Sequence, residues 1–115
     1  MSTLTSISNV NLTAVLTVFQ DRLKGLLGDR IKEIVLYGSY ARGEQNSESD
    51  VDILLITANK LDSSEKSRLA GIENEILINY GIYISVIPET EEFFNRYSWI
   101  PFYQNVHKDG IRLYG

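Results

Sequence analysis

Two short apolar runs with a polar segment between them constrain the fold of this chain most. IKEIVLYG (31–38) and VDILLIT (51–57) are rich in β-branched residues and too short for buried helices, so both are predicted to be buried strands. The segment between them, residues 39–49, is polar and turn-like and shows no long helical pattern. A parallel crossover normally contains a helix, so we expect the two strands to pair antiparallel or in a locally bent arrangement.

Two longer stretches have apolar residues at the three- and four-residue spacing of amphipathic helices. The first covers residues 11–27, with Asn11 as its expected N-cap. The second begins at a capping box formed by Asp62 and Glu65, and Gly81 suits its C-terminal end. The predicted buried stripes are Leu12, Val15, Leu16, Phe19, Leu23 and Leu26 in the first helix, and Leu69, Ile72, Ile76 and Tyr80 in the second.

The last third of the sequence contains two more short strand-like runs. GIYISVIP (81–88) is predicted to be a third strand that Pro88 closes, and GIRLYG (110–115) a final short one. A short helix with acidic residues in its first turn is expected after Pro88. The aromatic residues between 99 and 106 are expected to cover one edge of the core. This order favours a mixed sheet with helices packed on it over a regularly alternating doubly wound fold.

The order of the elements predicts a small α/β protein of the mixed α+β type, with a sheet of three to four strands, and the length and composition agree with one small domain. The 115 residues, of which 43% are hydrophobic, suit a single domain spanning residues 1–115. No apolar run approaches the ~18 to 20 residues that span a bilayer. The first ten residues have neither a basic leader nor an apolar signal core. Because the sequence also lacks cysteine, disulfides and thiolate metal sites are excluded and a cytoplasmic protein is expected.

The charge pattern argues against direct nucleic-acid binding. The formal net charge is −4, and no basic stripe of the kind that contacts a phosphate backbone is present. An acidic protein can still bind a nucleotide when divalent cations lie between its carboxylates and the phosphates. The aromatic-rich C-terminal end makes a dimer or a heterocomplex a reasonable expectation. The single histidine, His107, lies in a polar segment and is expected at the surface.

The segment between the first two strands combines residue types suited to a metal and a phosphate. Asp50 and Asp52 are two apart at the start of a strand, so their carboxylates project from one face, roughly 6.5 to 7 Å apart. Two such carboxylates repel each other unless a cation lies between them, and Mg²⁺ prefers a partial carboxylate shell. Gly38 allows a close backbone approach to a phosphate, Ser39 offers a hydroxyl, and Arg42 adds charge. Each piece alone is also common in solvated surface turns.

The combination resembles a known signature. GSYARGEQNSESDVDILL (38–55) is similar to the motif of the minimal nucleotidyltransferases of the DNA polymerase β-like superfamily. The resemblance covers essentially the whole chain, including the C-terminal PFYQNVHKDGIRLYG, and is least diagnostic in the first helix. The matching elements are Gly38-Ser39, Ala41-Arg42-Gly43 and Ser49-Asp50-Val51-Asp52.

The resemblance implies the nucleotidyltransferase fold and an activity. Members of this family transfer a nucleotidyl group, usually AMP from ATP, to a hydroxyl with the help of two Mg²⁺ ions. By this resemblance Asp50 and Asp52 would be catalytic metal ligands. The pair could hold two Mg²⁺ ions or only one. Gly38 and Ser39 would hold the triphosphate, and Arg42 would either assist them or form a structural salt bridge. Relatives often pair with HEPN-domain proteins as antitoxins of toxin–antitoxin systems.

One part of the family pattern is missing. The superfamily has a third carboxylate on a later strand, and here its expected position falls at Tyr83 or Ser85, neither of which is acidic. Glu89 has the same parity as these residues but follows Pro88. Two hypotheses therefore stay open. In the first, the chain transfers AMP from Mg²⁺–ATP to a hydroxyl of a partner protein or another acceptor, as an antitoxin of this family would. In the second, it is a catalytically weak or inactive module of the same fold that binds a nucleotide, a HEPN-type partner or both.

Overall fold

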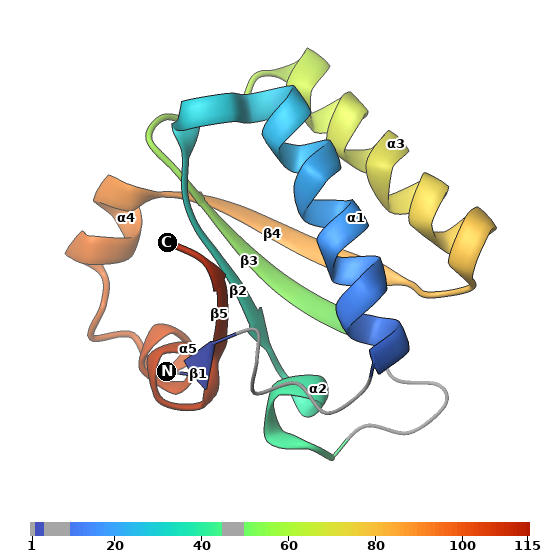
Figure 1. Ribbon diagram of the computed structural model, residues 1–115. Coiled ribbons are helices and arrows are strands. Elements are labelled where there is room, and N and C mark those ends of the chain that lie inside the picture. Colours follow the sequence, from blue (N-terminus) through green and yellow to red (C-terminus); the bar gives the residue numbers. More distant parts are fainter. Residues whose placement is uncertain (1, 4–9, 45–49) are drawn as a thin grey trace.

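The computed structural model describes residues 2–3, 10–44 and 50–115 (Figure 1). Its strands are β1 (Ser2–Thr3), β2 (Ile31–Tyr37), β3 (Val51–Thr57), β4 (Ile84–Thr90) and β5 (Ile111–Tyr114). Its helices are α1 (Val10–Leu27), the 3₁₀ turn η2 (Gly28–Arg30), α2 (Ser39–Arg42), α3 (Ser63–Tyr80), α4 (Glu91–Arg96) and α5 (Pro101–Asp109). None of these helices is long and apolar enough to cross a membrane.

The strands form one mixed sheet with the order β1-β5-β2-β3-β4. β2 pairs antiparallel with β3 and with β5, whereas β3 and β4 run parallel and are joined through α3. The antiparallel pairing of the first two long strands and the mixed sheet with packed helices are therefore confirmed. The two-residue strand β1 adds a short parallel edge that the sequence did not indicate.

Helices cover both faces of the sheet: α1 and α3 pack on one face, and α4 and α5 on the other (Figure 1). This double cover explains why β2 and β3 are nearly continuous apolar runs, because side chains on both faces of the strands are buried. On the α1/α3 face the core includes Leu16, Phe19, Leu23, Ile34, Leu36, Ile53, Leu55, Leu69, Ile76 and Ile84. On the α4/α5 face it is smaller and consists of Val35, Leu54, Ile56, Tyr103 and Val106.

The predicted boundaries of the long helices agree with the structure at most of their ends. Asp62 and Glu65 form the expected capping box: the Glu65 N–H donates to Asp62 Oδ1 at 2.8 Å, and the Asp62 N–H donates to Glu65 Oε1 at 3.0 Å. Gly81 adopts the left-handed conformation that ends α3. Asn11 is not an N-cap, because α1 already begins at Val10. Tyr80 is not buried either, because residues 77–80 are all exposed and the last turn of α3 lies clear of the core.

Pro88 does not close the third strand as predicted. β4 continues to Thr90, and Pro88 lies inside it opposite Leu55 of β3. The Val51 N–H donates to the Tyr83 carbonyl at 2.9 Å. In a parallel ladder every second residue of a strand bonds to the same neighbour, so the β4 residues in step with Tyr83 bond to β3. Pro88 is out of step with Tyr83, so its nitrogen points away from β3. Since β4 is an edge strand, the missing N–H removes no ladder bond, and the proline is tolerated.

The polar segment after β2 also differs from the prediction of a simple turn. Residues 39–42 form the short helix α2, which follows Gly38 directly and ends at Gly43. Residues 45–49 lie outside the described part of the chain. His107 is exposed, as expected.

Candidate functional site

Asp50 and Asp52 lie where three strands and α2 meet. Asp52 is the second residue of β3 and lies opposite Tyr37 of β2 and beside Ser85 of β4. Because alternate side chains of a strand lie on the same face, Asp52 shares a face of the sheet with Leu54. The helices α4 and α5 partly cover this face. Asp50 immediately precedes β3 and is exposed, whereas Asp52 is half-buried. Ser49 lies outside the described residues.

Gly38 holds the backbone against the Asp52 carboxylate. Its φ of 76° and ψ of −155° lie in a region that is essentially reserved for glycine. A Cβ at this position would lie 3.3 Å from Asp52 Cγ, and closer still to Oδ2. The glycine therefore allows the chain to turn sharply from β2 into α2 while the carboxylate packs directly on the turn.

Ser39 is the first residue of α2, so the first N–H groups of this helix open beside the aspartates. The amide nitrogens of a first helical turn have no partner within their own helix. Arg42 is the last residue of α2, and its N–H donates to the Gly38 carbonyl at 3.2 Å. The structure thus brings Gly38, Ser39, Asp50 and Asp52 to one corner of the sheet.

Arg42 takes part in two interactions at this corner. Its exposed side chain donates from Nε to Glu44 Oε2 at 3.2 Å, a surface ion pair of small energetic weight. Its charge also acts on Asp52, because it counters the rise in the pKa of that carboxyl. Beside it a depression of about 240 Å³ is lined by Tyr37, Gly38, Arg42, Phe102, Asn105, Val106 and Asp109.

The electrostatics at the corner favour a cation. Partial burial raises the pKa of Asp52 above its usual value, and the nearby Asp50 carboxylate raises it further. Burial and the charge of Asp52 also raise the pKa of the Tyr37 hydroxyl. In both groups burial is the larger cause of the raised pKa, and the charge of a neighbouring carboxylate is the smaller one. A bound cation would remove the repulsion.

The three candidates for the missing third acid lie in different places. Ser85 is directly beside Asp52 in the register of β3 and β4, and Tyr83 precedes it by two residues with half of its surface exposed. Glu89 lies four residues beyond Ser85, roughly 13 Å along the strand. Its carboxylate accepts from the Thr90 N–H at 3.0 Å and from the Tyr103 hydroxyl at 3.5 Å. The structure does not bring Glu89 to the aspartate pair.

A comparison with protein families places this geometry in context. The sequence model described as "Nucleotidyltransferase domain" matches residues 15–111. The chain belongs to the nucleotidyltransferase domain family. It is 38% identical over 96 residues to the Methanocaldococcus jannaschii protein named "Putative protein adenylyltransferase MJ0604", and the match covers 84% of this chain and 91% of that protein.

Solved structures share the nucleotidyltransferase fold. A crystal structure of a toxin–antitoxin with AMP-PNP superimposes with a TM-score of 0.57 at 23% identity, covering 84% of this chain and 73% of the other. A complex of the tri-AMPylated Shewanella oneidensis HEPN toxin with its MNT antitoxin superimposes with a TM-score of 0.51 at 20% identity, covering 86% and 71%. At these identities the likeness concerns the fold.

The corner of the sheet around Gly38 and Asp52 also contains residues that sequence reasoning missed. Tyr37 lies opposite Asp52, and its ring contacts that of Phe102 edge-on at a centroid distance of 5.3 Å. Asn105 and Asp109 of α5 line the adjoining depression. Tyr37 could have been noticed because it directly precedes Gly38. The α5 residues had no local signal, because only the tertiary fold brings that helix to the corner.

In the described part of the chain no group of three His, Cys, Asp or Glu residues is arranged to hold a metal.

Proposed function

We propose that this nucleotidyltransferase transfers AMP from Mg²⁺–ATP to a hydroxyl group of a partner protein. The observation that carries the proposal is the Asp52 carboxylate packed against Gly38 at the first turn of α2, with Asp50 two residues before it. The named relative of 38% identity, which is called a protein adenylyltransferase, supports AMP as the transferred group. The chain would act as a single domain in the cytoplasm.

The residues present fit a magnesium ion. Asp50 and Asp52 would supply hard oxygen ligands. Burial and, to a smaller extent, the charge of Asp50 raise the pKa of Asp52, and a divalent cation would offset both. Two carboxylates complete only part of the six-oxygen shell, which leaves positions for phosphate oxygens and water. When bound, Mg²⁺ would neutralise phosphate charge and polarise the reacting phosphoryl group. A site with two ions is the family's pattern, and a site with one ion is compatible with two carboxylates.

The chain's own groups have distinct roles in this proposal. The Ser39 hydroxyl and the first N–H groups of α2 would hold the triphosphate, because they are donors beside the aspartates. Arg42 would add positive charge at the same corner. The acceptor oxygen would attack the α-phosphorus, the bond to the pyrophosphate oxygen would break, and pyrophosphate would leave. The acceptor's proton would pass to solvent water, since β4 carries Ser85 where a carboxylate is expected.

The partner we propose is a HEPN-type protein. A structural neighbour is an MNT antitoxin in complex with a HEPN toxin that carries AMP groups, which matches the reaction proposed here. On this chain the face that carries Asp52 also has partly exposed aromatic side chains nearby, among them Tyr83 and Phe102. A tyrosine or another hydroxyl of the partner would reach the aspartates from this open side. The formal net charge of −4 gives no support for direct binding of a nucleic acid.

The test is transfer of labelled AMP. The chain is incubated with α-labelled ATP, Mg²⁺ and its co-expressed partner, and label on the partner is measured. Asp50→Ala combined with Asp52→Ala should abolish labelling. The control combines Asp21→Ala with Asp29→Ala, which removes the same charge from exposed positions on α1 and η2 and should leave labelling unchanged. Labelling that survives loss of Asp50 and Asp52 would refute their assignment.

The second candidate function is a non-catalytic module, and the observation that favours it is Ser85 beside Asp52. Such a module would bind a nucleotide, a partner protein or both without turnover. Calorimetry separates the candidates. Mg²⁺-dependent ATP binding without label transfer to the partner would support a nucleotide-binding module. No ATP binding at all would leave a pure interaction module, as a heterocomplex or as a dimer.

A further inference from the structure

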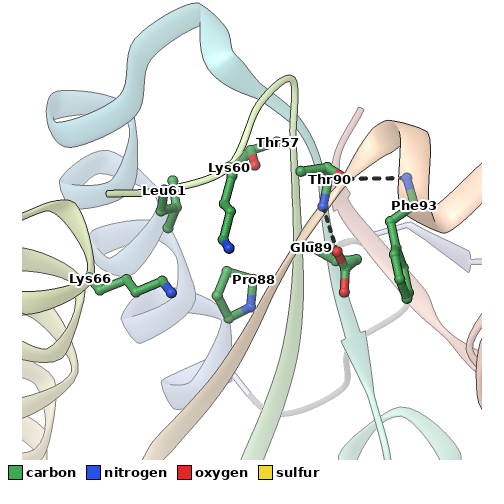
Figure 2. A pocket seen from close by; sticks show the side chains of 8 residues that line it. All are labelled: Thr57, Lys60, Leu61, Lys66, Pro88, Glu89, Thr90 and Phe93. Carbon is green, nitrogen blue, oxygen red and sulfur yellow. Dashed lines mark hydrogen bonds between the residues drawn. The ribbon is translucent and has the colours of Figure 1, made fainter. Parts of the chain in front are cut away.

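A second pocket lies at the opposite end of β3 and β4 from the aspartate pair. Thr57, at the end of β3, is five residues beyond Asp52, which corresponds to roughly 17 Å along the strand. The pocket has a volume of about 370 Å³, which is within the usual range for small-molecule sites (Figure 2). Its lining residues are Thr57, Lys60, Leu61, Lys66, Pro88, Glu89, Thr90 and Phe93.

Two lysines supply the positive charge of this pocket. Figure 2 shows the side chains of Lys60 and Lys66 extending toward Pro88 from the loop after β3 and from the first turns of α3. Neither lysine forms an ion pair with any residue in the described part of the chain. Two unpaired ammonium groups directed at one space repel each other, and an anion between them would relieve that repulsion.

The nearby carboxylates are engaged with other groups. Glu65 binds Arg30 and caps α3, and the Arg30 guanidinium lowers the pKa of Glu65. Asp62 accepts from the Glu65 N–H at 2.8 Å. Glu89 lies on the other side of β4 from the lysines in Figure 2, and its oxygens bind the Thr90 N–H and the Tyr103 hydroxyl. In the described part of the chain none of these carboxylates forms an ion pair with Lys60 or Lys66, although Glu89 also lines the pocket.

The loop that carries Lys60 is held in place by a set of hydrogen bonds. Arg30 donates from Nε to Asn59 Oδ1 at 2.8 Å and from its terminal nitrogen to the Lys60 carbonyl at 3.4 Å. The Thr57 hydroxyl donates to the Asn59 carbonyl at 2.8 Å. The Ala58 N–H donates to the Arg30 carbonyl at 2.8 Å. Because the loop backbone is already fixed, less conformational entropy of the protein is lost when a ligand binds to Lys60.

The pocket also has an apolar wall and a free donor. Leu61 is buried, and the Pro88 ring lies beside the ends of both lysine side chains in Figure 2. The Thr90 Oγ1 accepts from the Phe93 N–H at 3.1 Å, and its own hydroxyl hydrogen is bonded to no described residue. The lining thus offers cationic groups, a hydroxyl donor and apolar surface in one cavity.

We propose that this pocket binds a small organic anion that carries one phosphate or carboxylate group on an apolar ring. Lys60 and Lys66 would bind the anionic group, and Leu61 and Pro88 would contact the ring. The site is separate from the corner proposed to bind the nucleotide (Gly38, Ser39, Asp50 and Asp52), called the nucleotide corner below, and does not depend on the proposed activity. An anion of this size, unlike a triphosphate, needs no metal ion here, because the pocket supplies positive charge itself.

The test is an NMR titration of the uniformly ¹⁵N-labelled chain with phenyl phosphate and, separately, with benzoate, both without Mg²⁺. Saturable shifts are expected at the amides of Leu61, Lys66 and Thr90, and none at Gly38 or Ser39. A tighter response to one compound identifies phosphate or carboxylate as the preferred group. Phenol, which has the ring without the charge, should produce no saturable shift.

The variant with both Lys60→Ala and Lys66→Ala should bind at least about tenfold more weakly. Both side chains are exposed, so the fold should be retained, which circular dichroism checks. The control pairs Lys32→Ala with Lys108→Ala, which makes the same change in net charge elsewhere on the surface and should leave affinity unchanged. Shifts that do not saturate, that centre on Gly38, or that persist in the Lys60 and Lys66 variant would overturn the proposal.

Discussion

Replacing Gly38 with alanine tests whether the close contact with Asp52 builds the nucleotide corner. The backbone at Gly38 has φ 76° and ψ −155°, and a side chain there has a strain energy of about 1–3 kcal/mol. The added Cβ would also lie 3.3 Å from Asp52 Cγ and overlap Oδ2. Either the carboxylate rotates away or β2 and β3 shift apart. We therefore expect a loss of stability and a displaced metal ligand together.

A matched control separates backbone strain from the contact. Gly81 has a comparable φ of 68°, and a Cβ there meets no atom within 4 Å. Gly81→Ala should lower the free energy of unfolding by roughly 1–2 kcal/mol, the cost of a left-handed alanine. Gly38→Ala should lower it by at least as much. Urea denaturation measures both losses. The two positions differ in ψ, which is −155° at Gly38 and 19° at Gly81, and in what the Cβ touches.

Calorimetry with Mg²⁺–ATP gives the decisive measurement. Gly38→Ala should weaken binding by about tenfold or more, which corresponds to 1.4 kcal/mol. Gly81→Ala, whose Cβ would meet no atom within 4 Å, should leave binding unchanged. Equal affinities for the two variants would refute the idea that the packing of Asp52 on Gly38 positions the metal ligand. The strain would then be a feature of the turn alone.

Two further changes probe the charge at the same corner. Ser85→Asp would place a carboxylate beside Asp52, and AMP transfer should rise by about 10²-fold or more, the usual contribution of a general base. Ser85→Asn is its control, and an unchanged transfer rate in Ser85→Asp would exclude this position for the base. The folded-state pKa of Asp52 is raised, so the metal-free protein should lose stability as pH rises above the unfolded value of 3.8. Asp52→Asn should weaken that loss and raise the urea midpoint at pH 7 without Mg²⁺, and an unchanged midpoint would contradict the repulsion inferred at the corner.

Local signals in the sequence predicted most of the elements that frame the site. The β-branched runs became β2 and β3, and the reciprocal pair Asp62 and Glu65 caps α3, because these patterns depend on residues close in the chain. Pro88 shows where local reasoning fails. Its effect on a strand depends on which side faces a neighbour, and that is decided by the order of the strands in the sheet.

The residues of the candidate site also fall into two groups, those predictable from the local sequence and those that only the tertiary fold brings together. Gly38, Ser39, Asp50 and Asp52 could be predicted as a group because the β2–β3 connection brings them together over a short stretch of chain. The neighbours contributed by α5, Asn105 and Asp109, could not be predicted, since the packing of that helix on β2 is a tertiary event. The register that places Ser85 beside Asp52 is likewise a property of the parallel pair β3 and β4.

The charge at the nucleotide corner links stability to the kind of chemistry it supports. Asp52 is half-buried beside a second carboxylate, so the metal-free corner is destabilised, and a divalent cation bound there would stabilise the fold. A third carboxylate on β4 would increase both this repulsion and the affinity for cations. Ser85 in that place lowers the negative charge that a metal must neutralise, but it also removes the nearest candidate for a base. In the proposed function, binding of Mg²⁺–nucleotide would therefore depend on the aspartates, whereas the rate of transfer would depend on what the partner or solvent supplies at Ser85.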